Sequence, residues 1–181
     1  MFQGFPMFGL GRARRARKAA ADKLYAAAVA RARDPVFYAR LGVPDTPEGR
    51  FEMIALHGFA IMRRLKSAGA PGAQLSQDVF DALFADLDRN LREMGVGDLA
   101  VGKRIKRLAT QFFGRVLAYE QGLAAGEAAL SEVLARNIYA GKCLGAAELA
   151  SYVSALDRGL AAHDGAELLA GRLIFPPSPA E

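Results

Sequence analysis

The sequence predicts an all-α fold, a single-domain bundle of about six or seven helices. Apolar residues recur at i, i+3 and i+4 along most of the chain, whereas the strict alternation and the Val/Ile/Thr runs typical of strands are missing. The chain has 181 residues, 52% of them hydrophobic, which suits one folded domain. We predict a basic and apolar N-terminal arm over 1–16, a helical domain over 17–175, and a mobile tail over 176–181.

The first half of the chain contains three predicted helical segments. A first helix covers about 17–33 and ends before Asp34, and Pro35 then opens a short helical turn that Gly42 closes. Thr46 as N-cap and Pro47 at the first position start the next helix. Its apolar stripe is broad enough for the central helix of a bundle and consists of Phe51, Ile54, Ile61, Met62 and Leu65. The segment AGAPGAQ (68–74) is predicted to be a flexible connection.

Four further helices are predicted in the second half. The first runs from about 76 to 94 and carries on one face Phe80, Leu83, Phe84, Leu87, Leu91 and Met94. After a break at GVGD (95–98), a long helix follows with the stripe Ile105, Leu108, Phe112, Val116, Tyr119 and Leu123. The last two predicted helices cover about 127–139 and 146–162, and the closing FPPSPAE cannot continue a helix.

The positive charge of the chain is concentrated at its N-terminus. Residues 1–21 contain five cations and no acid, and the remainder has 19 cations and 19 acids, so the basic balance does not imply a body that coats nucleic acid. We predict that the start of the chain is an anchor on an anionic membrane surface, formed by Phe2, Phe5, Phe8, Arg12, Arg14, Arg15, Arg17 and Lys18. The apolar-then-basic order is the reverse of a secretory signal, and a mitochondrial presequence is the alternative.

The sequence contains few residue patterns that are typical of enzymes. His57 lies inside the apolar central helix, as packed core histidines do, and His163 lies at a helix end. Cys143 is the only cysteine, which fits a reducing compartment and an inert thiol. No metal-ligand spacing and no nucleophile motif occurs, and GVG lacks the Lys-Ser/Thr of a phosphate-binding loop. We therefore expect no enzyme activity, no metal and no cofactor.

The most unusual local chemistry surrounds the break at 95–98. Gly95 fits a left-handed helix end, Gly97 lets the chain turn, and Asp98 is predicted to cap the next helix. Four cations then follow early in that helix, where they oppose its dipole, after six acids over 76–98. The two groups either pair with each other, or one of them faces a partner, or the cations are a solvated face.

We predict a partner-binding surface around this break. It comprises Asp86, Asp88, Arg92, Gly95, Gly97, Asp98, Lys103, Arg104, Lys106, Arg107, Phe112 and Phe113. An exposed groove lined by Phe80, Phe84, Phe112 and Phe113 would suit a hydrophobic client, although plain core packing is the alternative for these side chains.

The stretch DLDRNLREMGVGDLAVGKRIKRLATQFFGR (86–115) closely resembles the signature of the ubiquinol–cytochrome c chaperone family. The resemblance extends to DPVFYARLGVPDTPEGRFEMIALH (34–57), ARNIYAG (135–141) and LIFP (173–176). It implies a helical, non-catalytic assembly factor for respiratory complex III that binds newly made cytochrome b. Mitochondrial members work with a small partner protein near the ribosomal exit tunnel.

The resemblance also suggests a location. Because this chain lacks the long N-terminal extension of the mitochondrial members, we expect a bacterial member on the cytoplasmic face of the inner membrane, or one on the matrix face if the source is eukaryotic. Two other functions use the basic arm and residues 103–107. One is an RNA- or ribosome-binding module, although aromatic and basic residues do not alternate as in a stacking platform. The other is a lipid-surface protein without a protein client.

Overall fold

The structure, a computed structural model, describes residues 7–142 and 144–179, with side chains from Gly11 onward. Within these residues it contains helices only, and the predicted all-α bundle is confirmed. Six helices are long: α1 (Met7–Ala32), α3 (Pro47–Lys66), α4 (Gly69–Glu93), α5 (Asp98–Ala125), α6 (Glu127–Ile138) and α7 (Ala146–Ala162). Two have five residues each, α2 (Pro35–Ala39) and α8 (Gly165–Leu169).

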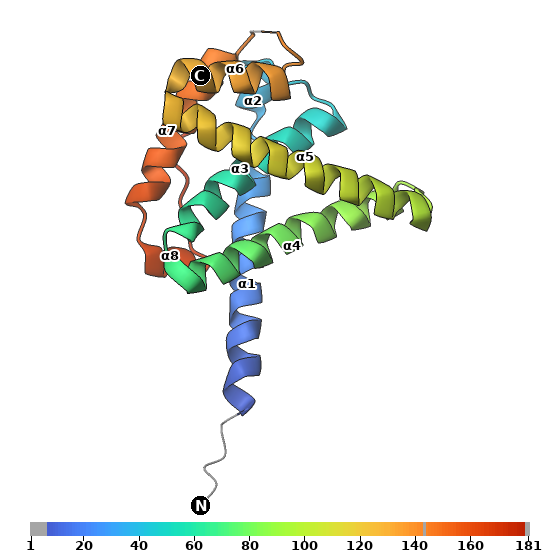
Figure 1. The fold of residues 1–181 in the computed structure, drawn as a ribbon, viewed down its shortest axis with the longest axis vertical. Coiled ribbons are helices and arrows are strands. Elements are labelled where there is room, and N and C mark those ends of the chain that lie inside the picture. Colours follow the sequence, from blue (N-terminus) through green and yellow to red (C-terminus); the bar gives the residue numbers. More distant parts are fainter. Residues whose placement is uncertain (1–6, 143, 180–181) are drawn as a thin grey trace, which may run out of the picture.

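Helix α3 is central, as its broad stripe predicts. It packs against α1, α4 and α7 and contributes side chains to both apolar clusters of the core. One cluster joins α3 to α2, α6 and α7, and the other joins it to α1, α4 and α5. In Figure 1, α4 and α5 converge to a hairpin that extends to one side of the body, and the N-terminal half of α1 extends below it. The hairpin tip and the start of α1 therefore have few neighbours.

The predicted helix starts at Pro35 and Pro47 are confirmed. The side chain of Asp34 accepts a hydrogen bond from the Val36 amide at 3.1 Å, and Thr46 Oγ1 accepts one from the Gly49 amide at 3.1 Å. Each side chain satisfies an amide that the first helical turn leaves without a partner. Gly42, which was predicted to end the segment that begins at Pro35, has a positive φ of 66°.

Two helix starts differ from the prediction. Helix α1 begins at Met7 rather than near residue 17. Residues 12–16 are all Arg or Ala, which are good helix formers and need no apolar stripe. The segment 68–74, predicted to be a flexible connection, lies almost entirely in α4. Pro71 is in the first helical turn, where its missing amide costs little. A Cβ on Gly72 would lie 2.0 Å from the Leu65 carbonyl oxygen, so this glycine permits the close approach of α4 to the end of α3.

The chain after α8 lies along the bundle. The ring of Phe175 is edge-on to His57 with centroids 5.8 Å apart, and the Arg31 guanidinium lies over the same ring at 5.4 Å. Ser178 is hydrogen-bonded to both Asp34 and Arg31. These contacts extend past residue 176, where we predicted that the tail begins.

Candidate functional site

The break between α4 and α5 is a short helix-ending loop. Gly95 has φ +79°, and its amide donates to the Arg92 carbonyl at 2.9 Å while the Val96 amide donates to the Leu91 carbonyl at 3.1 Å. This pair of hydrogen bonds is typical of helices that end at a left-handed glycine, as the sequence predicts here. The prediction for Asp98 was wrong: Gly97 is the N-cap residue, without a side-chain cap, and Asp98 is the first residue of α5. Asp98 instead forms an ion pair with Arg92.

Several acids before the break have partners other than the cations that follow it. Arg92 also pairs with Asp88 at 2.6 Å, so it bridges two carboxylates. Asp86 accepts a hydrogen bond from the Tyr25 hydroxyl at 2.8 Å, and this contact and burial raise the pKa of Tyr25. The acids of 76–98 therefore do not pair with the cations that follow them, which removes the first of the three alternatives stated above.

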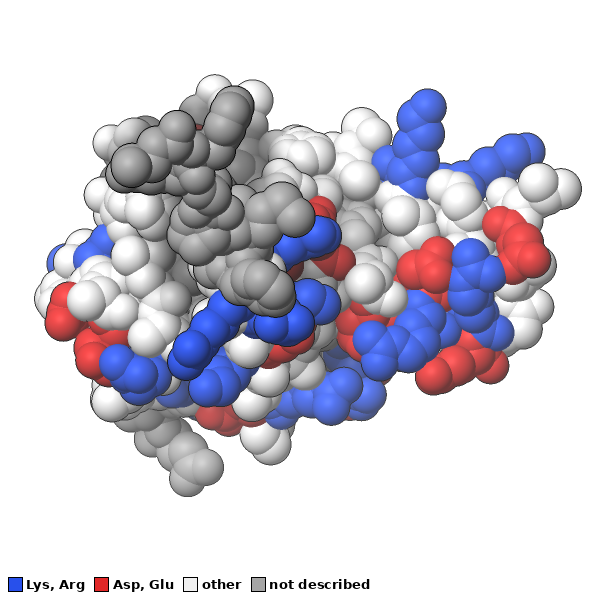
Figure 2. All heavy atoms as spheres, turned by 90° about the horizontal axis from the view of Figure 1, so that it is seen from below, with Lys and Arg blue, Asp and Glu red and all other residues white. Residues whose placement is uncertain are grey.

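The four cations at the start of α5 lie free in solvent. Lys103, Arg104, Lys106 and Arg107 are all exposed, and none forms an ion pair with any residue that the structure describes. Figure 2 shows basic side chains standing clear of acids at one edge of the hairpin end, whereas acids and bases are mixed along the rest of it. This basic surface is available to a negatively charged partner.

Farther from the hairpin tip than these cations, aromatic side chains of α4 and α5 form a cluster. The Phe80 ring stacks on Phe113 with centroids 5.3 Å apart and lies 4.5 Å from the Phe84 ring. Phe112 is 1% exposed and belongs to the core, whereas Phe113 is 59% exposed. The two residues thus differ in exposure, because neighbouring positions on a helix point in different directions.

A groove of about 270 Å³ lies between α3, α4 and α5. Its apolar lining includes Met62, Phe80, Phe112, Phe113 and Val116. Ala73 and Gln77 of α4 line it and are exposed, and Phe84, which we predicted in the lining, lies buried behind Phe80. The predicted aromatic groove therefore exists, with three of its four phenylalanines in the lining.

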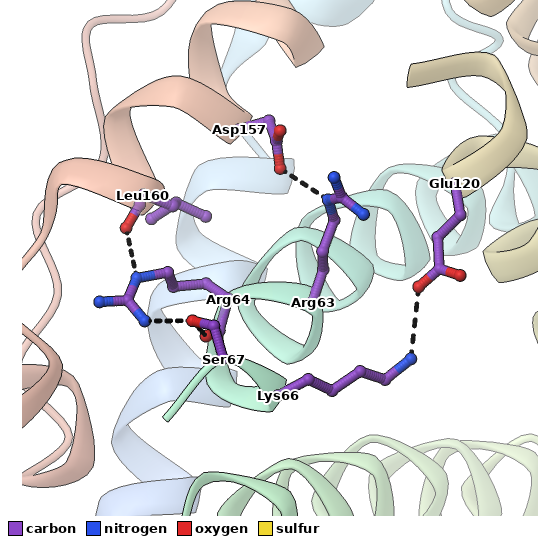
Figure 3. A network of polar contacts seen from close by, with 7 residues as sticks. All are labelled: Arg63, Arg64, Lys66, Ser67, Glu120, Asp157 and Leu160. Atoms are coloured by element: carbon purple, nitrogen blue, oxygen red, sulfur yellow. Dashed lines mark hydrogen bonds and ion pairs between the residues drawn. The ribbon is translucent and has the colours of Figure 1, made fainter. Parts of the chain in front are cut away.

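The cations at the end of α3 beside the groove have structural partners (Figure 3). Arg63 pairs with Asp157 of α7 at 2.8 Å, and Lys66 pairs with Glu120 of α5 at 3.3 Å. Arg64 donates to the carbonyl oxygens of Leu160 and His163, which satisfies acceptors at the end of α7. The sequence indicated only that these cations suit the α3 dipole, because their partners come from helices distant in the sequence.

A buried ion pair fixes α5 against α3. Arg115 makes two hydrogen bonds to the Glu52 carboxylate, and both side chains are largely buried. Burial raises the pKa of Glu52 by more than the hydrogen bonds and charge of Arg115 lower it. Sequence reasoning assigned Glu52 only to the helix dipole and missed this pair, for which a single sequence offers no signal.

His57 is a core residue, as predicted from its apolar surroundings. Its Nδ1 lies 2.8 Å from the Met53 carbonyl oxygen and its Nε2 lies 2.9 Å from the Tyr152 hydroxyl. A carbonyl oxygen only accepts, so Nδ1 carries the proton and Nε2 accepts from Tyr152. Complete burial lowers the pKa of His57 to about 4. Within the described residues, no three histidine, cysteine or carboxylate side chains come together as metal ligands would. Cys143 lies outside the described residues.

The predicted N-terminal anchor divides into three parts. Phe2, Phe5 and the side chain of Phe8 lie outside the part of the chain that is described. Arg17 pairs with Asp78 of α4 at 2.5 Å and Lys18 pairs with Asp22 at 3.4 Å, so these two charges have partners. The remaining cations are exposed and form no ion pair with described residues: Arg12, Arg14 and Arg15.

Comparison with known proteins agrees with this helical architecture. A sequence model of the ubiquinol–cytochrome c chaperone family matches residues 39–175. The crystal structure of the Cbp3 homolog from Brucella abortus superimposes with a TM-score of 0.85 and 37% sequence identity, covering 96% of this chain and 97% of that one.

Two eukaryotic relatives are longer than this chain. The mouse ubiquinol-cytochrome c reductase complex assembly factor 1 is 25% identical over 126 residues, which are 70% of this chain and 43% of the mouse protein. The yeast protein CBP3, mitochondrial, is 28% identical over 109 residues, which are 59% of this chain and 32% of the yeast protein. The mouse relative is named as an assembly factor. The chain belongs to the ubiquinol–cytochrome c chaperone family.

Proposed function

We propose that this protein is a non-catalytic chaperone that binds newly made cytochrome b and so assists the assembly of respiratory complex III. The relatives' names support an assembly role in general. A newly made membrane subunit exposes apolar side chains that must be kept from aggregating before assembly. The observation that carries the proposal is the apolar groove between α3, α4 and α5. Four exposed cations without partners among the described residues lie on α5 between this groove and the hairpin tip.

The two parts of this surface contribute differently to binding. Met62, Phe80 and Val116 give the groove an apolar lining that fits an apolar segment of the client. The basic start of α5 accelerates the encounter with a negatively charged surface, which is an effect on the association rate that weakens with salt.

We place the protein at the cytoplasmic face of the inner membrane, or the matrix face in a mitochondrion, in peripheral contact with anionic lipid. Among the described residues no helix is both long and apolar enough to cross a membrane. The exposed cations Arg12, Arg14 and Arg15 support a peripheral contact by the start of α1. A ribosome or a small partner protein near the site of synthesis is a further proposed contact.

Charges placed in the groove test the proposal. Ala73 and Gln77 are exposed and line the groove, so Ala73→Glu with Gln77→Glu should leave the fold intact while putting two carboxylates into an apolar site. With a photocrosslinking residue at Val116, we expect the wild type to capture cytochrome b in cells and the variant to capture much less. The level of assembled complex III should fall in parallel.

A matched control puts the same charges elsewhere. Ala128→Glu with Ala161→Glu changes two exposed alanines outside the groove and should leave capture unchanged. Normal capture by the groove variant would contradict the proposal. Capture of ribosomal RNA in place of cytochrome b, with a strong salt dependence, would favour the RNA-binding alternative.

Reversal of all four cations, Lys103, Arg104, Lys106 and Arg107, to Glu tests the steering role. Because acids suit the start of a helix, the variant should fold. We expect the variant to associate more slowly with cytochrome b and to support less assembled complex III. In the wild type, the association rate should fall with added salt. Unchanged complex III levels would mean that these cations are a solvated face.

A further inference from the structure

Helix α5 carries a row of exposed residues along the side that faces away from the bundle. The row consists of Leu99, Lys103, Lys106, Thr110, Phe113 and Leu117, which follow one another at intervals of three or four residues and so lie on one side of the helix. The opposite side faces the bundle and contains the buried Val101, Phe112 and Tyr119. From Leu99 to Leu117 the row spans about 27 Å at the rise of an α-helix.

Exposed apolar side chains are concentrated on this hairpin. Of the six large hydrophobic side chains that are exposed among the described residues, four belong to the hairpin: Met94 (70%), Leu99 (89%), Phe113 (59%) and Leu117 (58%). Three of these four lie in the outer row of α5. An apolar row of this kind normally has an apolar environment to enter.

Between Leu99 and Tyr119 the charged side chains of α5 are all of one sign. From Leu99 to Tyr119 the sequence contains five cations and no acid. Arg115 is buried in its pair with Glu52, and the other four cations are exposed without a partner among the described residues. Helix α4 carries five acids, among them Asp81, Asp88 and Glu93, and two arginines, and Asp98 at the start of α5 pairs with one of these, Arg92. The hairpin thus has an acidic helix and a basic helix, which would orient it near a negatively charged plane.

We propose that the outer row of α5 lies on an anionic phospholipid surface. Leu99, Phe113 and Leu117 would enter the interface between headgroups and acyl chains, and Lys103 and Lys106 would extend to the headgroup phosphates. A bilayer fits the row better than a protein does. A stable protein interface needs about 800 Å² of complementary surface on each partner, whereas this row is one convex helix face, which a deformable and negatively charged interface can accept.

The contact would also orient the groove. Phe113 belongs to the row and to the groove lining, so a protein lying on the row would hold its groove beside the bilayer. The contact does not depend on the identity of the client, and it is distinct from the contact proposed for the start of α1. In Figure 1 the hairpin that carries the row and the start of α1 extend from the body in different directions.

Fluorescence can locate the contact directly because the chain contains no tryptophan. Leu99→Trp and Leu117→Trp each place one reporter in the row. With vesicles of phosphatidylcholine and phosphatidylglycerol we expect a blue shift of the emission and quenching by brominated lipid, and with phosphatidylcholine alone we expect neither. Ile174→Trp is the control, since Ile174 is 82% exposed but lies outside α5, and its emission should not change. Bound vesicles without a blue shift at either row position would overturn the proposal.

Partitioning measures the contribution of the row. Lys103→Gln with Lys106→Gln should lower the vesicle partition coefficient about 25-fold, because each basic residue near an anionic surface contributes about a factor of five. Leu99→Ser with Leu117→Ser should also lower it, and Arg136→Gln with Arg158→Gln, which removes two exposed cations elsewhere, should lower it less.

The outcomes separate this contact from client binding. The variant Leu99→Ser with Leu117→Ser changes no side chain that lines the groove and none of the four steering cations, so it should still capture cytochrome b from detergent solution. Row variants that bind vesicles as the wild type does would overturn the proposal. If those variants also failed to capture cytochrome b, the row would be a client surface instead.

Discussion

His57 illustrates how one buried side chain makes stability depend on pH. Its ring is completely buried and its pKa is lowered to about 4, against an ordinary value of 6.5. The unfolded chain therefore binds a proton at this site at a higher pH than the folded chain does. Stability from His57 is fully present above pH 6.5 and is lost as the pH falls towards 4.

We expect the free energy of unfolding to fall by about 2 kcal/mol between pH 7 and pH 5 because of His57 alone. His57→Gln should be less stable than the wild type at pH 7, since Met53 or Tyr152 loses a well-placed partner. The difference in the free energy of unfolding between the two proteins should shrink at pH 5. At that pH the wild type is destabilised because the unfolded chain takes up a proton at His57, and the variant has no such group. Chemical denaturation at both pH values measures this, and a constant difference would contradict it.

The ion pair of Glu52 and Arg115 leads to a second prediction at this scale. Arg115→Met leaves a buried carboxylate without its counter-charge, which should cost about 3–5 kcal/mol of stability at pH 7. The pKa of Glu52 is already raised by burial and should rise further in the variant. Glu52 then takes up a proton as the pH falls, so the loss should be smaller at pH 5 than at pH 7.

The double variant Glu52→Gln, Arg115→Met is the control, because it removes both charges from the interior. It should be more stable than Arg115→Met alone at pH 7, and the two should converge at low pH. A double variant as unstable as the single one at pH 7 would show that packing, and not charge, accounts for the loss.

At the scale of one element, α4 carries an apolar stripe of which only the first part is buried. Leu83 is 1% exposed, Leu87 is partly buried, and Met94 is largely exposed. The stripe has one pattern throughout, but the body covers only its first part because the hairpin extends past the bundle (Figure 1). Periodicity identifies a face and cannot say how far the neighbouring helices reach along it.

Leucine truncations along α4 should follow this gradient. We expect Leu83→Ala to cost about 2–5 kcal/mol, as for a fully buried leucine, and Leu87→Ala to cost less than Leu83→Ala. Met94→Ala should have an effect within about 0.5 kcal/mol of zero, as for an exposed side chain. Denaturant unfolding of the three variants measures the order, and equal losses at Leu83 and Leu87 would place the second residue in the core after all.

For the whole molecule, the start of α1 and the outer row of α5 are two proposed membrane contacts. Deletion of residues 1–16 removes Arg12, Arg14 and Arg15 but keeps the pair of Arg17 with Asp78. From Gly11 onward, the first buried side chain of α1 is Ala20. We therefore expect the truncated protein to keep its helical circular dichroism. Its fraction in cell membranes should fall, because three cations near the anionic leaflet are lost.

The two contacts can be separated by combining changes. The deletion together with Lys103→Gln and Lys106→Gln should partition more weakly than either change alone. A deletion protein that partitions as the full chain does would rule out the N-terminal contact and leave the row of α5 as the remaining candidate. In each case thermal unfolding confirms that the fold is intact.

The sequence by itself determined the elements of this protein. Thr46 and Pro47 predicted the start of α3 correctly and Gly95 the end of α4, because caps and turns are local. The signature at 86–115 indicated the family that the comparisons show. Helix formation within 7–16 was missed because this segment has no apolar stripe. Helix formation within 69–75 was missed because the segment contains Gly and Pro, whose effect depends on their position in the helix.

Only the tertiary structure decided which predicted site residues act together. The cations of 103–107 and the acids of 76–98 are neighbours in the sequence, yet Arg92 and Tyr25 engage the acids and leave the cations exposed. The groove needs Met62 from α3 beside Phe80 and Phe113, and Glu52 meets Arg115 across 63 positions of the chain. Such pairings follow from how helices pack in three dimensions. The local pattern of one sequence does not say which helix faces, distant in the sequence, pack against each other.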